Sequence, residues 1–318
     1  KNPIIMKILI TGGAGFIGSN LAKKISLTHE VTVLDNLSSG FRENLKLSNI
    51  KFIKCDLLDL KKLKKITSGF KVIFHLAANA DIRFNLQDRY KALEQNAICT
   101  FNVLEAMKYN KIKRIIFSST GSVYGDTKIF PTPENVPIPN QTSLYAASKL
   151  YCESLIQSYC EAYGFQAWIF RFASILGPHY SHGHVFDFIK QLKKNKKKLK
   201  ILGDGNQRKT YLHVDDCINA MILALKKNNK KINIYNLATP QSITVKNSIK
   251  IITNTMKLNP KKIFTGGKQG WVGDQKIVSL DIKKIKKLGW KNKFSIEDGI
   301  EDTAKWILKN KWILNKRK

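Results

Sequence analysis

The stretch KILITGGAGFIGSNLAKKI, residues 7–25, constrains the fold more than any other part of the chain. It sets Gly12, Gly15 and Gly18 between a short apolar run that is typical of a strand and a longer pattern that is typical of a helix. Glycines at such a turn let the backbone approach a pyrophosphate, and the N-terminus of the following helix favours the same anion. The stretch therefore predicts the first strand, turn and helix of a dinucleotide-binding sheet.

Short apolar, β-branched runs alternate with longer helical patterns along the chain, and the clearest helical patterns cover 90–110 and 143–164. The runs look buried on both faces, as the strands of parallel sheets are. This alternation predicts an α/β fold with a Rossmann-type doubly wound parallel sheet. The expected strands cover residues 7–11, 30–35, 50–57, 71–77, 113–119, 165–175 and 232–238.

The chain is expected to divide into two parts. Residues 1–175 form the predicted NAD-binding Rossmann domain, and 232–238 return to it as a strand. Residues 176–231 and 239–318 are rich in loops and helical patterns. They are expected to form a smaller C-terminal substrate-binding lobe at the carboxyl ends of the strands, where such sheets bind ligands. Apolar runs stay well under 18 residues, so no membrane span is expected.

Two acidic residues lie at the ends of expected strands. Asp35 ends the second strand, 17 residues after Gly18. A carboxylate there can hydrogen-bond the ribose hydroxyls of adenosine and would repel a ribose phosphate, which favours NAD over NADP. Asp56 lies at the end of the third expected strand, where it either reaches the adenine edge or caps the next helix.

The net charge of +32 raises the question of a nucleic-acid partner. Most of this charge is lysine scattered through every expected helix, and only seven arginines are present. Arginine is the residue that base and phosphate recognition favours for its bidentate geometry. The composition therefore indicates a solvated lysine-rich surface, and we expect no nucleic-acid partner.

Cysteine and histidine usage bears on compartment and metal content. The five cysteines are an odd number without CxxC spacing, which indicates reduced thiols of a cytoplasmic protein. Three histidines, His179, His182 and His184, gather in HYSHGH. That segment reads as a loop and has no cysteine partner, so we expect no metal site there.

The segment YAASK puts Tyr145 and Lys149 four residues apart on one face of an expected helix. Free tyrosine has a pKa of about 10 and is a poor base at neutral pH. A nearby ammonium and the positive nicotinamide ring favour the phenolate and lower that pKa. Tyr145 is therefore the candidate acid/base. Hydroxyls also end the strand upstream, in SSTGSVYG from Ser118.

Many motifs occur in the order known from one family: TGGAGFIGSN, CDLLD, HLAANA, EQNAICTFNVLEA, SSTGSVYG, YAASK, RFASILGP, GDGNQRKTYLHVDD, GWVGD and LGW. On these motifs the chain resembles the extended short-chain dehydrogenases/reductases that modify nucleotide sugars, and among them the UDP-glucose/galactose 4-epimerases. The resemblance covers nearly the whole chain. It implies a bound NAD, a UDP-sugar held between the two parts, and a homodimer formed through two helices that include the Tyr145 helix.

The resemblance also assigns roles to matching positions. Thr120, Tyr145 and Lys149 are the implied catalytic residues, and the first two also contact substrate. The implied cofactor-binding residues are Gly12, Gly15, Phe16, Ile17, Gly18, Asp35, Asn36, Asp56, Leu57, Leu76, Ala77, Ala78, Asn96, Ser118, Tyr145 and Lys149.

The absence of an acid after Thr120 separates related reactions. Related dehydratases look like TDE at this strand end and decarboxylases like TSE, whereas this chain reads Thr120-Gly121-Ser122. Neither glycine nor serine replaces a general acid/base whose pKa must lie near the working pH. What remains suffices to oxidise carbon 4 and reduce it again through a 4-keto intermediate, which inverts carbon 4 if the sugar turns over.

Several positions depart from the epimerase pattern. The arginine expected before the C-terminal Gly-Asp is Trp271, with Lys268 as the nearest cation. The segment RKTY leaves Arg208 or Lys209 to hold phosphate, and Ser174 replaces an asparagine.

The position implied to face carbon 2 of the sugar is Val278, which either lines the pocket or packs in a core. A small residue there leaves room for an N-acetyl group, so UDP-GlcNAc and UDP-GalNAc are further candidate substrates.

Two alternatives stay open. One is another nucleotide-sugar enzyme, a UDP-glucuronate 4-epimerase or a dehydratase, although no cation can be assigned to a sugar carboxylate. The other is a non-catalytic NAD-binding regulator, against which the intact Thr120, Tyr145 and Lys149 argue.

Overall fold

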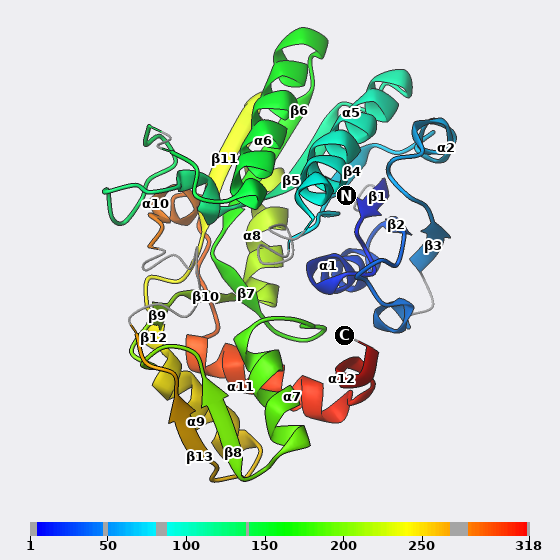
Figure 1. Ribbon diagram of the computed structural model, residues 1–318. Helices are drawn as coiled ribbons and strands as arrows, with labels where there is room; N and C mark the ends of the chain where they lie inside the picture. Colours follow the sequence, from blue (N-terminus) through cyan, green and yellow to red (C-terminus); the bar gives the residue numbers. More distant parts are fainter. Residues whose placement is uncertain (1–4, 47–49, 81–87, 138–139, 268–278, 317–318) are drawn as a thin grey trace.

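The computed structural model describes residues 5–46, 50–80, 88–137, 140–267 and 279–316. Its centre is a seven-stranded sheet in the order β11-β6-β5-β4-β1-β2-β3, and every neighbouring pair is parallel. This confirms the predicted Rossmann-type sheet (Figure 1). The strands are β1 (Lys7–Thr11), β2 (Glu30–Asp35), β3 (Ile50–Lys54), β4 (Val72–His75), β5 (Arg114–Thr120), β6 (Gln166–Phe172) and β11 (Ile232–Leu237).

Helices cover both faces of the sheet because successive strand residues point to opposite sides. Ile8 and Ile10 join one buried cluster with α1 (Phe16–Ile25) and α8 (Val214–Lys227). Leu9 joins the other cluster, with α2 (Leu60–Ile66), α5 (Cys99–Tyr109) and α6 (Leu144–Tyr163). The doubly wound arrangement therefore follows from strands that are apolar on both faces.

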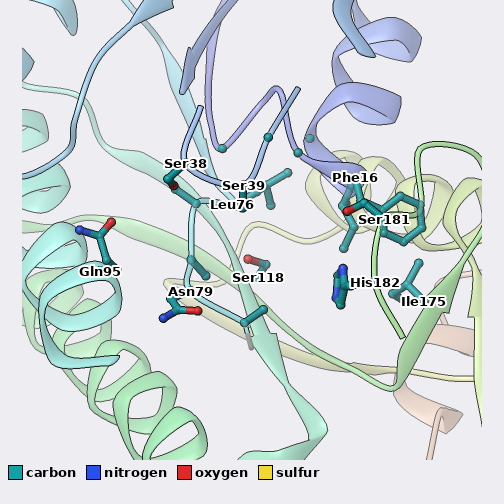
Figure 2. Close-up of a pocket in the computed structure, with 18 of the residues that line it drawn as sticks. Phe16, Ser38, Ser39, Leu76, Asn79, Gln95, Ser118, Ile175, Ser181 and His182 are labelled. Carbon is teal, nitrogen blue, oxygen red and sulfur yellow. The ribbon is translucent and has the colours of Figure 1, made fainter. Parts of the chain in front are cut away.

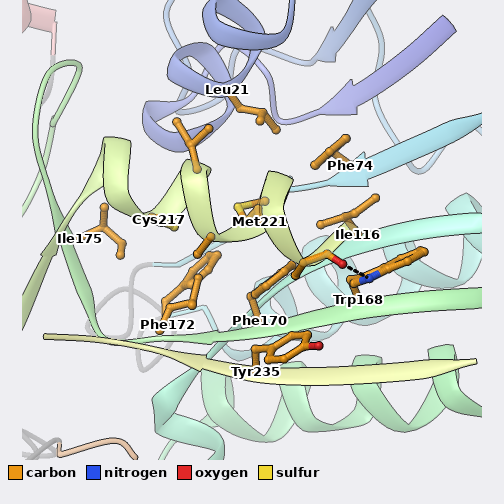
Figure 3. Packing of buried hydrophobic residues seen from close by; sticks show 14 of the residues in the cluster. Leu21, Phe74, Ile116, Trp168, Phe170, Phe172, Ile175, Cys217, Met221 and Tyr235 are labelled. Carbon is orange, nitrogen blue, oxygen red and sulfur yellow. Dashed lines mark hydrogen bonds between the residues drawn. The ribbon is translucent and has the colours of Figure 1, made fainter. Parts of the chain in front are cut away.

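The first of these clusters is shown in Figure 3. Leu21, Cys217 and Met221 on the helices pack onto the aromatic and aliphatic side chains of the strands. The Trp168 indole N–H donates to the Ala224 carbonyl at 3.1 Å, so the one polar atom of this large buried ring has a partner in α8.

The pattern over 90–110 forms three consecutive helical segments. They are α4 (Arg89–Ala92), the π-helical turn η2 (Leu93–Ile98) and α5. The π-turn carries Asn96, which is buried. The pattern over 143–164 is α6, whose N-cap is Ser143 and whose end is the left-handed Gly164 (φ 64°). Ser143 accepts a hydrogen bond from the amide of Ala146, as an N-cap does.

The expectation of one strand over 165–175 is wrong. β6 ends at Phe172, and β7 (Ser174–Leu176) pairs with β10 (Tyr211–His213) outside the central sheet. The last link to the sheet is the Ala173 amide, which donates to the Leu237 carbonyl at 2.9 Å. The chain thus leaves the sheet one residue before Ser174. The third and fourth strands, β3 and β4, are also shorter than predicted. Because β3 ends at Lys54, Asp56 lies in the turn that follows it.

Residues 184–201, 245–264 and 296–309 gather below the sheet in Figure 1 and form much of a third apolar cluster. The division into two domains at residue 175 remains a prediction. No helix among the described residues is long and apolar enough to cross a membrane. The further elements are η1 (Arg42–Leu45), η3 (Gly121–Tyr124), α7 (His184–Lys194), β8 (Lys198–Ile201), β9 (Arg208–Lys209), β12 (Ile243–Thr244), α9 (Val245–Thr255), β13 (Lys261–Phe264), α10 (Lys283–Lys286), α11 (Ile296–Lys309) and α12 (Trp312–Lys316).

Candidate functional site

A cleft of about 1130 Å³ lies at the carboxyl ends of the central strands. Figure 2 shows Leu76 and Ser118 from this sheet edge between Gln95 on one side and His182 on the other. Most of the predicted site residues line this cleft: Gly12, Gly15, Phe16, Ile17, Gly18, Asp35, Asn36, Asp56, Leu57, Leu76, Ala77, Ala78, Ser118, Thr120, Tyr145, Lys149, Ser174 and Lys209.

The glycine turn is built for close backbone approach. Gly12 has a φ of 68°, and a Cβ there would lie 2.6 Å from the Ala77 backbone. A Cβ on Gly18 would lie 2.3 Å from the Gly12 carbonyl oxygen. No side chain caps α1 at Gly15, so the first amides of the helix are available to an anion in the cleft. These features fit the pyrophosphate of a dinucleotide.

Asp35 is held at the end of β2 by two backbone donors. Its Oδ2 accepts from the Ala14 amide at 3.0 Å and its Oδ1 accepts from the Leu37 amide at 2.8 Å. Burial raises the pKa of this carboxyl. An ionised carboxylate has about four acceptor positions, so two remain for the ribose hydroxyls.

Asp56 does not cap the next helix, so that alternative is wrong. The N-cap of α2 is Asp59, which accepts from the Lys62 amide at 2.9 Å. The Asp56 carboxylate instead accepts from the Leu58 amide at 2.9 Å and from the Asn36 side chain at 3.1 Å. Because Asn36 and Asp56 also line the cleft, the two ends of β2 and β3 form one polar corner beside Asp35.

The candidate catalytic residues converge from two elements. Thr120 ends β5, and a side-chain hydrogen bond joins it to Tyr145 on α6. One turn later Lys149 lies under the same strand end, where its ammonium donates to the Ser118 carbonyl at 2.8 Å and lies 4.5 Å from the centre of the Phe117 ring. The structure therefore brings Thr120, Tyr145 and Lys149 to one place.

The pKa of Tyr145 differs from the sequence-based expectation. Burial raises the pKa of Tyr145 to about 12, and the hydrogen bond with Thr120 opposes this shift. Burial also lowers the pKa of Lys149 to about 8. The protein's own residues therefore do not produce the expected lowering, because burial of the phenol outweighs it.

Two predicted site residues do not line the cleft, and a third lies outside the described residues. Asn96 is absent from its lining, because its amide bonds both backbone groups of Asn79 (2.9 and 3.2 Å) and the Ser148 hydroxyl (2.9 Å). Arg208 bonds Ser242 instead, at 2.9 and 3.2 Å. Val278 lies outside the described residues, as do Trp271 and Lys268.

The histidine segment does not form one cluster. His179 bonds the Ser19 hydroxyl at 2.6 Å, and His184 bonds Ser248 and Tyr211 at 2.6 and 2.9 Å. Burial lowers the pKa of His179 to about 4 and that of His184 to about 3. His182 lines the cleft. Within the described ranges, no group of three or more His, Cys, Asp and Glu could hold a metal ion.

The sequence reasoning missed other lining residues. Lys91 and Gln95 reach the cleft from the helices before α5, Phe41 from the segment after β2, and Lys316 from the C-terminal helix. Lys91 and Gln95 are half-buried polar residues four positions apart in the helical pattern 90–110, which is only a weak signal. No local pattern marks Phe41 or Lys316.

A tyrosine and a lysine on one helix face, beside a dinucleotide-binding turn, define a short-chain dehydrogenase/reductase. The additional elements after the sheet make it one of the extended type. The chain matches the model of the NAD dependent epimerase/dehydratase family over residues 8–238. It therefore belongs to that family, and NAD is its cofactor.

Individual relatives are similar along the whole chain. A Methanocaldococcus jannaschii protein with the provisional name UDP-glucose 4-epimerase is 33% identical, over 95% of this chain and 99% of that protein. A crystal structure of UDP-galactose 4-epimerase is also 33% identical, with a TM-score of 0.87 over 96% of this chain and 100% of the other. The UDP-N-acetylglucosamine 4-epimerase of Methanobrevibacter ruminantium M1, in complex with UDP-N-acetylmuramic acid, is 29% identical with a TM-score of 0.86, over 97% and 100%. The chain is an isomerase of the extended short-chain dehydrogenase/reductase type.

Proposed function

We propose that the enzyme interconverts UDP-glucose and UDP-galactose by inverting carbon 4 through a 4-keto sugar. The observation that carries this proposal is the composition of the cleft around Tyr145. Among the described residues that line the cleft, the carboxylates are Asp35 and Asp56, and both lie at the far side of β4 and β1 from Thr120. A dehydratase needs an acid beside the reacting carbons, so this lining favours epimerisation.

Proton transfer is the task of the residues at the end of β5. Tyr145 accepts the proton of the sugar's 4-hydroxyl, and Thr120 bonds the phenol and relays that proton. Lys149 holds positive charge beside this centre and is itself fixed by the Ser118 carbonyl. Burial raises the pKa of the Tyr145 phenol and so opposes loss of its proton. A positive charge in the loaded site would lower this pKa and favour the phenolate.

NAD, when bound, supplies the hydride acceptor and donor for carbon 4. The glycine turn would hold its pyrophosphate, Asp35 its adenosine ribose, and Asn36 with Asp56 the adenine side. Asn96 supports this binding site indirectly, because it fixes the backbone of Asn79, which lines the cleft.

Lys209 is the cation proposed for the diphosphate of the UDP-sugar. The sequence left Arg208 and Lys209 as alternatives, and Lys209 lines the cleft while Arg208 bonds Ser242. Ser174 also reaches the cleft, because the chain leaves the sheet at Ala173.

N-acetylated UDP-hexoses are the second candidate substrates. They are favoured by the similarity to the Methanobrevibacter ruminantium UDP-N-acetylglucosamine 4-epimerase. The family resemblance implies that Val278 faces carbon 2 of the sugar. Valine is much smaller than tyrosine and would leave room there for an N-acetyl group.

We also propose a cytoplasmic homodimer. Large apolar side chains are exposed on the two helices that flank the central strands, namely Phe101 and Tyr109 on α5 and Tyr151 on α6. Pairing of these helices in a second copy would cover them. All five cysteines are free and buried, as is usual in a reducing compartment.

The test is NMR of five UDP-sugars after incubation with the purified protein: UDP-glucose, UDP-galactose, their N-acetylated forms and UDP-glucuronate. The expected result is equilibration of UDP-glucose with UDP-galactose from either side, with no 6-deoxy product. Turnover of UDP-glucuronate alone, or 6-deoxy-4-keto signals, would assign the enzyme to one of the alternatives. The Tyr145→Phe protein, treated identically, is the control for a contaminating epimerase.

A further inference from the structure

The C-terminal helix α12 lies against the segment that follows β2 (Figure 1). The Trp312 ring meets the Phe41 ring edge to face, with centroids 5.5 Å apart and an interplanar angle of 76°. The Lys316 ammonium forms an ion pair with the Glu43 carboxylate. These contacts join residues more than 270 positions apart, because Lys316 and Glu43 are separated by 273 residues.

The segment that α12 contacts is packed directly on the dinucleotide turn. The Phe41 amide and the Asn44 side chain both donate to the Ala14 carbonyl at 3.0 Å. A Cβ on Gly40 would lie 2.9 Å from both Ala14 and the Asp35 carboxylate, so the backbone there is as close as a glycine allows. Helix α12 is therefore one layer away from the turn and from Asp35.

Lys316 itself lines the cleft, as Gly40 and Phe41 do. The other lysines among the described residues that line the cleft lie on other elements. Lys149 is fixed under Ser118, Lys209 lies on β9, and Lys91 pairs with Glu94 at 2.9 Å on the helical segment before α5. Lys316 is thus the lining lysine that pairs with Glu43, on the segment packed against the glycine turn, and the turn offers backbone amides to an anion.

The pair with Glu43 leaves Lys316 available for another anion. Its side chain keeps 49% of its surface exposed and that of Glu43 keeps 31%. Exposed ion pairs of this kind contribute little, so an exchange from the carboxylate to a phosphate carries little cost. Trp312 holds the start of the helix on Phe41, which keeps the Lys316 side chain within the cleft lining.

We propose that Lys316 binds a phosphate group of the bound dinucleotide, and that α12 is the element that places it there. The role lies outside residues 8–238, the part of the chain that the family model covers. It concerns cofactor retention and does not depend on which sugar the enzyme uses.

The experiment measures NAD affinity of the full-length chain after removal of bound cofactor, by titration calorimetry at low salt. Lys316→Ala should weaken NAD binding by about threefold, the size expected for a half-exposed charge pair. The effect should shrink at high salt. The matched control is Lys311→Ala, an exposed lysine of the same segment that does not line the cleft, and it should not change the affinity. Equal affinities of the Lys316 and Lys311 variants would overturn the proposal.

A second variant separates cofactor contact from a structural ion pair. Glu43→Gln removes the competing carboxylate and should leave NAD affinity equal or higher. If Glu43→Gln weakens binding as much as Lys316→Ala does, the pair is only structural and the proposal is wrong. UDP is titrated into the NAD-loaded proteins as the remaining probe. A loss of UDP affinity in Lys316→Ala with NAD affinity unchanged would assign the charge to the substrate instead.

Discussion

The guanidinium of Arg171 lies 2.7 Å from the carboxylate of Glu153, and their side chains expose only 4% and 1% of their surface. Arg171 is on β6, and Glu153 is one turn after Lys149 on α6. Glu153 also accepts from the hydroxyl of Ser119, the residue before Thr120. The pair therefore fixes the catalytic helix to the strand end that carries the relay hydroxyl.

Arg171→Met should destabilise the protein strongly, by about 3–5 kcal/mol, because it leaves the Glu153 carboxylate buried without its partner. The free energy of unfolding from urea titrations measures this loss. The control is Lys231→Met, which breaks the exposed pair of Lys231 with Glu161 (2.7 Å) and should cost less than about 1 kcal/mol. Similar losses in the two variants would show that the buried pair contributes no more than an exposed one.

Tyr145→Phe should lower kcat by about 10²–10⁴-fold, because it removes only the oxygen that transfers the proton. NAD affinity, measured by calorimetry, should be retained. Tyr151→Phe is the matched control, since Tyr151 is 51% exposed on the same helix. A Tyr145→Phe enzyme that keeps more than about a tenth of the rate would exclude Tyr145 as the base.

Thr120→Ala should reduce kcat less than Tyr145→Phe does. Water can occupy the space of the lost hydroxyl and bond the Tyr145 phenol in its place. The same variant also removes the bond that the Thr120 oxygen accepts from the Ser122 amide at 3.1 Å, so unfolding should be measured alongside. A larger loss of kcat than for Tyr145→Phe, in a protein of unchanged stability, would reverse the proposed ranking.

The sequence predicts the central sheet well, because each strand is a local apolar run bounded by polar residues. It does not show where β6 ends. Residues 172–176, FASIL, contain no glycine or proline that would mark the end of a strand, and the break at Ala173 is set by pairing with β11 and β10. Short pairs such as β13 with β8, where Lys261 faces Lys198, join distant segments and leave no local pattern.

The candidate site shows the same difference between local patterns and contacts of distant segments. The sequence identifies its local motifs, which are the glycine turn, Asp35, and the pair of Tyr145 and Lys149. Asn96 was assigned to the cofactor, but in the structure it bonds the Asn79 backbone, a contact across 17 residues that spacing alone does not reveal. Lys316 belongs to no local motif, since only the folded chain brings it to the glycine turn.

Asp35 should make NAD bind at least about tenfold more tightly than NADP, a difference of about 1.4 kcal/mol. The reason is that the buried carboxylate would face the ribose phosphate of NADP, and juxtaposed like charges cost several kcal/mol. Calorimetric titration with both cofactors gives the ratio. Asp35→Asn removes the negative charge and should reduce the ratio of NAD affinity to NADP affinity. Equal binding of NAD and NADP to the unchanged protein would mean that Asp35 does not select the cofactor.

Lys149→Met should make the protein more stable near neutral pH while it removes activity. Lys149 is 2% exposed, and burial lowers its pKa from 10.5 to about 8. Below about pH 8 the ammonium is charged in both the folded and the unfolded chain, so its burial costs stability. Between about pH 8 and 10.5 the unfolded chain holds the proton that the folded chain has lost, and this cost disappears as the pH rises.

The stability difference between Lys149→Met and the unchanged protein should therefore decline from about pH 8 to pH 10.5. The pKa shift corresponds to a decline on the order of 3 kcal/mol. Urea unfolding followed by circular dichroism across this range measures it, and the comparison cancels titrations common to both proteins. Lys61→Met, at an exposed position of α2, is the control and should stay within about 0.5 kcal/mol. A difference that does not change with pH would show that Lys149 keeps an ordinary pKa, and the positive charge assigned to the catalytic centre would then be present throughout this range.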